Sequence, residues 1–381
     1  MNQRRAILAL NPGSATLKAR FYRDRVVAGA PLQPSGECLH FDLDAGLPAT
    51  GEASQAARLF ELLLAALPAN GPAPEIVAYR IVHGGTRVAP VLLDDEVLGE
   101  LACLEPLAPL HQPVALQLVR AARARWPAAR HVAVFDTSWH AGLAEWSRRL
   151  PIPLALHEAG VVRFGFHGIA FQSAFGLLSA LDDGARQQRI VLAHLGSGSS
   201  LCAVQGGRSI DTTMGFTPLD GLPMATRSGS LDPGVLLYLQ RELRMTPESL
   251  QRALWRESGQ LGVSGLSGDM RVLLESALPA ARLAVDQFVM RVAQGVAAMA
   301  TSLGGIDAVV FSGGIGSHSP PVRERVLAQL AWMGIRMDTV ANASGASRID
   351  AADSASRVWQ VLVDEELELA TSALACAQAR A

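Results

Sequence analysis

Two segments of the chain, one in each half, share a pattern of short apolar strands separated by turns rich in glycine and serine. The first runs over 5–30 as AILAL, NPGSAT, LKARFY and VVAGA, and the second begins near Arg189 as IVLAH, GSGSS, LCAV, QGGR and SIDTT. Short apolar runs between turn residues are typical of antiparallel strands, so each segment predicts a three-stranded meander. The repetition favours a fold of two similar domains.

The two segments also match each other position by position. LALNPGSATLKA (8–19) faces LAHLGSGSSLCA (192–203) at a constant offset of 184, with four identical positions among twelve. Chance is an alternative explanation for so short a match between two hairpins with glycine- and serine-rich turns. Its place in each half of the chain nevertheless favours duplication.

Helical and strand patterns alternate after each meander. EASQAARLFELLLAAL precedes EIVAYRIV in the first half, and VDQFVMRVAQGVAAMATSL precedes DAVVFSGG in the second. This alternation predicts the α/β class. A chain of 381 residues is also too long for one typical core, and the prolines of RRLPIP (148–153) mark the expected domain junction.

Composition excludes several classes of protein. The net charge of −2 gives no global field for nucleic acid or an anionic membrane. The four cysteines are far apart and lack zinc-site spacing, which predicts reduced thiols and a cytoplasmic protein. The long uncharged stretch 164–181 is interrupted by glycine, histidine, glutamine and serine, so we expect a soluble protein without a membrane span.

Three turns rich in glycine or serine directly follow apolar strands, at 11–16, 196–200 and 313–318. Glycines let backbone amides approach phosphate oxygens, and hydroxyls add further donors. Each turn alone is more simply an ordinary hairpin or strand-to-loop turn. Together in a duplicated scaffold they favour phosphate binding, and none matches a P-loop or a Rossmann fingerprint.

Four basic or imidazole side chains, Arg80, His111, His167 and Arg227, lie in apolar or glycine-rich surroundings. The planar fork of arginine suits carboxylate and phosphate oxygens, and arginine stays charged. A buried ion pair is the alternative for each arginine, and a core residue with satisfied hydrogen bonds is the alternative for each histidine.

Carboxylates form a third group of candidates, at Asp136, Asp211, Asp232 and Glu365. Asp136 follows an apolar strand, where α/β sheets present functional residues. The run 364–366 is as well explained by capping of a helix N-terminus. Magnesium, however, needs only one or two carboxylates beside phosphates.

Eleven motifs in this order resemble those of the acetate kinases over nearly the whole chain. They are NPGSATLK, YRIVHGG, LAPLHQP, VFDTSWH, RFGFHG, AHLGSGSS, DTTMGFTPLDGL, TRSGSLDP, GVSGLSGDMR, FSGGIG and VDEELELA. The combination of MGFTPLDGL with TRSG is especially specific.

The resemblance implies two duplicated ribonuclease-H-like domains, each a mixed sheet with flanking helices, around a central cleft. We expect residues 1–150 with 366–381 to form the N-terminal domain, and 151–365 the nucleotide-binding domain. It further implies ATP and ADP as co-substrates, Mg²⁺ or Mn²⁺ as the metal, a small carboxylate as acceptor, and a homodimer.

The resemblance also assigns roles to individual residues. Arg80, Asp136, His167 and Arg227 are the implied catalytic residues, and Asn11 and Glu365 the metal-site residues. The substrate site is implied at Arg80, Val82, Leu110, His111, Phe166 and Pro218. The nucleotide site is implied at Ser14, Thr16, Lys18, His194, Leu195, Gly196, Ser197, Gly198, Asp269, Met270, Arg271, Gly314, Ile315, Gly316, Ser317 and His318.

Several residues depart from the family pattern. Ser197 replaces the usual asparagine of the second loop, and Ser317-His318 replaces Glu-Asn in the third. Gln112, Phe171 and Ser230 also differ from the pattern. The expected reaction is transfer from ATP to acetate, and the alternatives are a propionate or butyrate kinase, another donor such as pyrophosphate, or a catalytically silent nucleotide-binding regulator.

Overall fold

The chain forms two compact units in a computed structural model that describes residues 3–13, 16–26, 37–44, 55–69 and 71–379. Unit 1 comprises Met1–Ala141, His167–Ser173 and Asp364–Ala381, and unit 2 comprises Gly142–Phe166 and Ala174–Val363. Each unit has its own sheet and its own apolar core.

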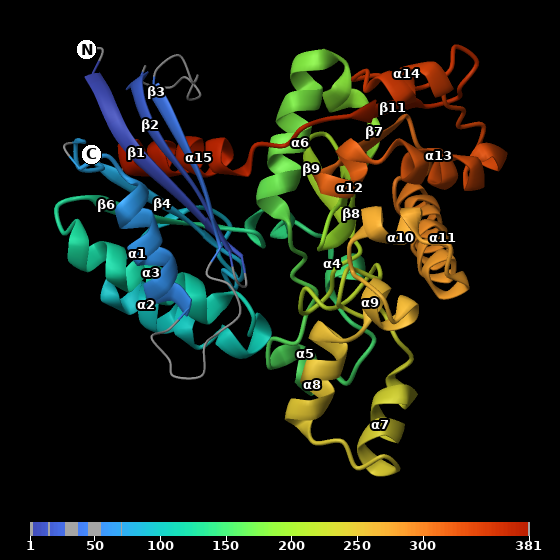
Figure 1. Ribbon diagram of the computed structural model, residues 1–381, viewed down its shortest axis with the longest axis horizontal. Coiled ribbons are helices and arrows are strands. Elements are labelled where there is room, and N and C mark those ends of the chain that lie inside the picture. Colours follow the sequence, from blue (N-terminus) through green and yellow to red (C-terminus); the bar gives the residue numbers. More distant parts are fainter. Residues whose placement is uncertain (1–2, 14–15, 27–36, 45–54, 70, 380–381) are drawn as a thin grey trace. The chain divides into compact units, whose positions relative to one another are not determined.

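Unit 1 contains a mixed six-stranded sheet in the order β3-β2-β1-β4-β6-β5 (Figure 1). The meander β1–β3 is antiparallel, whereas β4 pairs in parallel with both β1 and β6. The strands are β1 (Gln3–Pro12), β2 (Thr16–Val26), β3 (Glu37–Asp44), β4 (Ile76–Ile81), β5 (Val91–Leu92) and β6 (Arg130–Phe135).

Helices cover both faces of this sheet, because alternate residues of each strand point to opposite sides. In β1, Leu8 and Leu10 enter the core beneath α1–α3, whereas Ile7 and Ala9 pack with α15. Figure 1 shows α1–α3 on one face and α15 on the other. The helices are α1 (Gln55–Ala66), α2 (Asp95–Ala102), α3 (Gln112–Arg125) and α15 (Glu365–Ala379).

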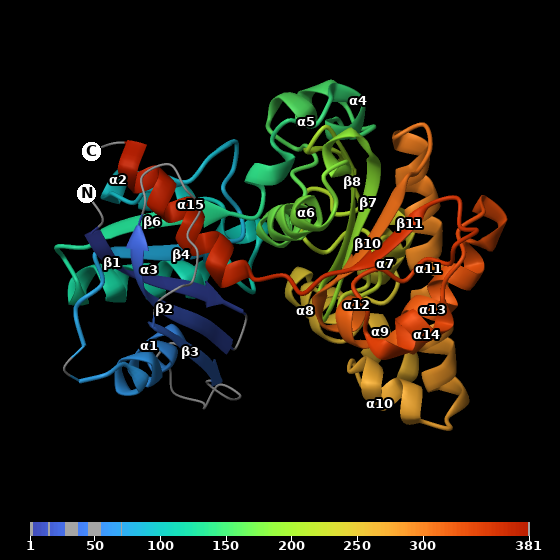
Figure 2. The same ribbon diagram turned by 90° about the horizontal axis from the view of Figure 1, so that it is seen from above.

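Unit 2 contains a five-stranded sheet in the order β11-β10-β7-β8-β9 (Figure 2). Its strands are β7 (Arg189–Leu195), β8 (Ser199–Gln205), β9 (Arg208–Thr212), β10 (Ala308–Ser312) and β11 (Arg357–Gln360). The long helix α11 (Pro279–Ser302) packs on one face through a buried stripe that includes Val285, Phe288, Val292 and Val296, as the helical spacing of its apolar residues predicts.

Smaller helices complete unit 2. They are α4 (Glu145–Arg148), α5 (Leu154–Glu158), α7 (Pro233–Arg241), α8 (Pro247–Arg256), α9 (Gly259–Ser264), α10 (Met270–Glu275), α12 (Gly313–His318), α13 (Pro320–Gln329) and α14 (Thr339–Ser344). Helix α6 (Gly168–Leu181) begins in unit 1 and ends in unit 2. Among the described residues, no helix has both the length and the apolar composition needed to cross a membrane.

The two sheets repeat one topology. An antiparallel meander, β1–β3 or β7–β9, is followed by a parallel strand beside its first strand and then by one more parallel strand, β4 and β6 or β10 and β11. The expected α/β fold of two duplicated units, each a mixed sheet with flanking helices, is therefore confirmed.

Three local expectations need correction. The constant offset fails across the turn, because Leu8 pairs with Phe21 thirteen residues later, whereas Leu192 pairs with Cys202 only ten residues later. The third strand of the described meander is β3, which pairs with β2. Strand β2 continues to Val26, and the rest of the expected strand, 27–30, lies outside the described residues. The turn at 313–318 is the short helix α12.

Candidate active site

The carboxyl ends of three neighbouring strands bring candidate residues together in unit 1. Strands β1, β4 and β6 are parallel to one another, so Asn11, Arg80 and Asp136 fall at one edge of the sheet. Arg80 donates from Nε and Nη2 to Oδ2 of Asp136 at 2.9 and 2.7 Å. Its Nη1 donates to Oδ1 of Asn11 at 3.3 Å.

The Arg80–Asp136 pair is a buried ion pair. Burial raises the pKa of Asp136, which is 1% exposed, against the opposing charge and hydrogen bonds of Arg80. Burial by itself lowers the pKa of Arg80, but the charges of Asp136, Glu365 and Glu366 outweigh it and raise that pKa. Arg80 therefore remains a cation at the sheet edge.

The start of α15 adds carboxylates to this cluster. Nδ2 of Asn11 donates to Glu365 at 3.1 Å and to the buried Glu366 at 2.7 Å. Arg20 pairs with Asp364, whose Oδ1 also accepts from the backbone of Leu367 and caps the helix. The capping expected for the run 364–366 is thus confirmed, while Glu365 contacts Asn11.

The donor chemistry of this corner fits magnesium. Asn11 and Glu365 supply an amide and a carboxylate oxygen, the hard ligands that Mg²⁺ takes together with water and phosphate oxygens. The described residues hold no cluster of three or more histidine, cysteine or acidic side chains suited to a metal. One amide and one carboxylate oxygen fit a metal that is bound together with phosphate oxygens and water.

The N-terminus of α6 lies against Asp136. Gly168 donates to the carbonyl of Asp136 at 2.9 Å, and a Cβ at Gly168 would overlap that carbonyl. The amide of Ile169 bonds to the Asp136 carboxylate and favours its charged form. The preceding residue, His167, is half-buried and has a φ of 60°, a left-handed conformation that non-glycine residues rarely adopt.

The other unit 1 candidates differ in exposure. Val82 and His111 are buried and Leu110 is half-buried. Thr16 and Lys18, at the start of β2, are exposed, whereas Ser14 lies outside the described residues.

Unit 2 holds the remaining catalytic candidate, Arg227, in the loop before α7. Its Nη1 donates to the carbonyl of Pro218 at 3.0 Å, and its guanidinium carbon lies 5.6 Å from the ring centre of Trp255. Pro218 and Phe166 are both buried, and the segment before Phe166 bonds to Gly215 through the amides of Phe164 and Gly165.

Two of the glycine-rich segments meet within unit 2. A Cβ at Gly196 would lie 3.8 Å from the amide nitrogen of Gly314, and one at Gly313 would lie 2.6 Å from the carbonyl oxygen of Leu195. Nδ1 of His194 lies 3.2 Å from Oγ of Ser312. The β7–β8 turn and α12 are therefore neighbours, and Asp269, Met270 and Arg271 start α10 in the same unit.

The residues that depart from the family pattern have different surroundings. Ser317 is buried and donates to the carbonyl of Val361 at 2.8 Å, so its hydroxyl holds α12 to the segment after β11. Ser197 and His318 are exposed. Ser230 donates to Asp220 at 2.6 Å and accepts from the amide of Gly221.

Several residues outside the expected site residues contact these candidates. Glu366 and Arg20 belong to the cluster around Asn11, and Trp255 lies against Arg227. Arg323 is 1% exposed and donates to the carbonyls of Gly316, Ser317 and Asn342. Nothing in the sequence around Arg323 indicated this role.

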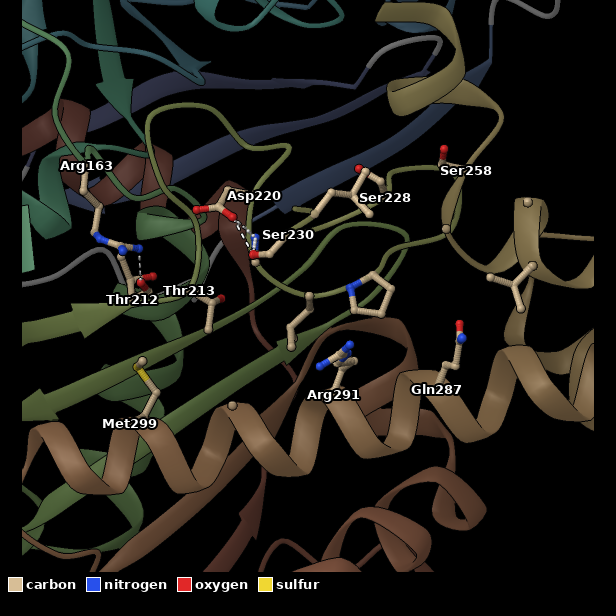
Figure 3. Close-up of a pocket in the computed structure, with 18 of the residues that line it drawn as sticks. Arg163, Thr212, Thr213, Asp220, Ser228, Ser230, Ser258, Gln287, Arg291 and Met299 are labelled. Atoms are coloured by element: carbon tan, nitrogen blue, oxygen red, sulfur yellow. Dashed lines mark hydrogen bonds between the residues drawn. The ribbon is translucent and has the colours of Figure 1, made fainter. Parts of the chain in front are cut away.

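A cavity of about 820 Å³ lies elsewhere in unit 2, between α11 and the loops before α7 and α9. Figure 3 shows Gln287, Arg291 and Met299 rising from α11 on the side of the loops that carry Thr213, Ser230 and Ser258. Of the candidate residues only Asp211 lines it, and its wall also includes both sides of the loop that carries Arg227.

Comparisons with known proteins agree with the fold and with the resemblance found in the sequence. The chain is 40% identical to an acetate kinase of Rhodopseudomonas palustris over 96% of each protein, and 38% identical to one of Methylocella silvestris. Its fold matches a propionate kinase of Francisella tularensis (TM-score 0.83, 28% identity, 97% and 99% of the two chains covered). It also matches the acetate kinase of Porphyromonas gingivalis (TM-score 0.80, 30% identity, 98% and 100% covered).

The fold and these relatives define the class of the protein as a kinase, a phosphotransferase. The acetokinase family matches residues 49–371. The chain belongs to the acetokinase family.

Proposed function

We propose that this protein is an acetate kinase that transfers the γ-phosphoryl group of ATP reversibly to acetate, giving acetyl phosphate and ADP. The observation that carries the proposal is the cluster of Arg80, Asp136, Asn11 and Glu365 at one sheet edge in a chain 40% identical to a named acetate kinase. The cluster combines a fixed cation with the oxygen ligands of a magnesium site.

Direct in-line transfer asks the protein for positioning and charge stabilisation rather than for a nucleophile. Arg80 and Arg227 neutralise the substrate carboxylate and the phosphoryl group, and His167 donates to the same transition state. Asp136 fixes the fork of Arg80 by accepting two of its N–H groups. Asn11 and Glu365 would hold Mg²⁺ or Mn²⁺, which would supply positive charge to the phosphates.

The acceptor end is assigned to Val82, Leu110, His111, Phe166 and Pro218. The buried, β-branched side chain of Val82 favours a small apolar group beside the carboxylate. One additional methylene changes binding in such a pocket by only about 1–3 kcal/mol, so propionate is the nearest competing acceptor. The structural similarity to a propionate kinase gives this alternative its support.

The donor end is assigned to the glycine-rich segments and to α10. Gly196 and Gly314 are neighbours with backbone groups close to each other, a geometry suited to phosphate oxygens. Thr16 and Lys18 are assigned to phosphate contacts, and Asp269–Arg271 are assigned to adenosine. Ser197 and His318 depart from the family pattern and are exposed in these segments, so pyrophosphate remains the competing donor.

The test is a hydroxylamine trap for acyl phosphate with acetate, propionate and butyrate, each with ATP and with pyrophosphate. Acetate with ATP should give the highest kcat/KM. Arg80→Ala and Arg227→Ala should lower turnover by orders of magnitude, whereas Arg123→Ala, which removes an exposed pair with Asp95, should not. Nucleotide binding without hydroxamate from any acceptor would instead identify a silent regulator.

We also propose a homodimer located in the cytoplasm, with units 1 and 2 acting as the N-terminal and C-terminal domains. Helix α7 has no buried side chain and exposes Val235, Leu237 and Tyr238, an apolar surface that suits a partner. Light scattering on the protein and on Leu237→Glu should show a dimer that the substitution weakens. Equal masses for the two proteins would remove this surface from the proposal.

A further inference from the structure

The backbone around Arg227 is bonded on both sides to the segment that contains Trp255. The amide of Ser228 donates to the carbonyl of Leu254 at 3.1 Å, and the amide of Ser258 donates to that of Thr226 at 3.0 Å. Oγ1 of Thr226 donates to the carbonyl of Trp255 itself at 2.9 Å. The Cα of Arg227 is therefore held in place against the end of α8 before any side-chain contact is considered.

The side chain of Arg227 is held by two further contacts of different kinds. The carbonyl of Pro218 accepts from Nη1 at 3.0 Å, which fixes one edge of the guanidinium. The indole of Trp255, only 6% exposed, lies with its ring centre 5.6 Å from the guanidinium carbon. A cation within about 6 Å of an indole centre is attracted by the electron density of the ring face, most strongly where water is excluded.

We infer that Trp255 is a positioning residue for Arg227, and that its indole holds the guanidinium in the orientation that receives the phosphoryl group. The inference rests on the proposed role of Arg227 in transfer. An aromatic face attracts a cation without accepting from its in-plane N–H groups, so the contact with Trp255 itself takes up none of those donors. A carboxylate in the same place would occupy them, as Asp136 occupies two N–H groups of Arg80.

The chain offers a matched control in the same unit. Trp359 in β11 is 7% exposed, and Arg348 lies 5.9 Å from its ring centre. Neither residue belongs to the proposed site. Trp359→Leu should thus reproduce the loss of stability that follows from removing a buried tryptophan beside an arginine, without affecting Arg227.

The first experiment compares steady-state kinetics of Trp255→Phe, Trp255→Leu and Trp359→Leu. Trp255→Leu should lower kcat by about tenfold, equal to about 1.4 kcal/mol of transition-state stabilisation, with a smaller change in the KM for ATP. Trp255→Phe should keep kcat within about threefold of the parent, because it retains an aromatic face. Trp359→Leu should leave kcat unchanged.

The second experiment preserves the shape of the side chain and remains decisive if Trp255→Leu does not fold. Tryptophan carrying an increasing number of ring fluorines is incorporated at position 255 alone, so that electron density is withdrawn from the ring face stepwise. The logarithm of kcat should fall steadily with fluorination if the cation–π contact positions Arg227. A kcat independent of fluorination would overturn the inference.

Arg227→Ala separates this inference from the proposal on which it rests. If Arg227→Ala retains near-normal turnover, the assigned role of Arg227 is wrong. If Arg227→Ala is inactive while Trp255→Leu and the fluorinated proteins have normal kcat, only the positioning role of Trp255 is wrong.

Discussion

His83, buried directly after β4, should make unit 1 sensitive to acid. It is 0% exposed, and its Nδ1 accepts from the amide of Gly85 at 3.0 Å. Its own backbone is bonded at both ends to the side chain of Gln112. Burial lowers the pKa of His83 from 6.5 to about 4, because the charged imidazolium loses its hydration in this site.

The sign of the effect follows from which state takes up the proton. As the pH falls below 6.5, His83 is protonated in the unfolded chain but stays neutral in the folded one, so the free energy of unfolding decreases until the pH reaches about 4. The difference of about 2.5 pKa units corresponds to about 3 kcal/mol at 1.36 kcal/mol per unit. Stability is complete above the unfolded pKa and is lost on acidification.

The assay compares urea unfolding of the parent and of His83→Asn at several pH values from about 7.5 to about 4. Asparagine keeps an acceptor near Gly85 but does not titrate, so the variant should be less stable at neutral pH and should lose less stability in acid. The gap should close by about 3 kcal/mol over this range. His40→Asn, a change at an exposed histidine of β3, should follow the parent. A gap that is independent of pH would refute the reasoning.

Three further substitutions test close approaches and buried charges. Gly259→Ala should destabilise unit 2 by about 2–4 kcal/mol in thermal unfolding, because the φ of Gly259 is +62° and an added Cβ would overlap the carbonyl of Met224. The control Gly304→Ala has a similar φ of +67° but no atom within 4 Å of the added Cβ, so it should cost only about 1 kcal/mol. Asp136→Asn keeps the shape of the side chain but removes the buried negative charge that pairs with Arg80. The free energy of unfolding in chemical denaturation should therefore fall by about 3 kcal/mol, and the initial rate should fall by at least about 100-fold. Parental values for both quantities would contradict the pairing. The lysine of Arg323→Lys cannot reproduce the guanidinium fork that donates to the carbonyls of α12, so the KM for ATP should rise several times more than the KM for acetate. The control Arg325→Lys, at an ion pair with Asp286, should change neither constant. Equal increases in both constants would show that Arg323 does not act through α12.

The sequence by itself determined the class of fold and the duplication. Strands β1, β7, β8 and β10 follow apolar runs between turn residues, and α1 and α11 follow helical spacing, because local periodicity depends only on neighbouring residues. The capping of α15 by Asp364 is local for the same reason. The family resemblance followed from the order of the motifs, because motifs are compared from sequence alone.

The tertiary structure decided what each candidate side chain contacts. The sequence left Arg80 open between an anion site and a buried ion pair, and the pairing with Asp136, fifty-six residues away, depends on the parallel register of β4 and β6. The indole against Arg227 and the inward hydroxyl of Ser317 are likewise contacts between distant segments. Such contacts are set by how elements pack rather than by local pattern, so only the folded chain shows which charges are balanced and which hydroxyls are structural.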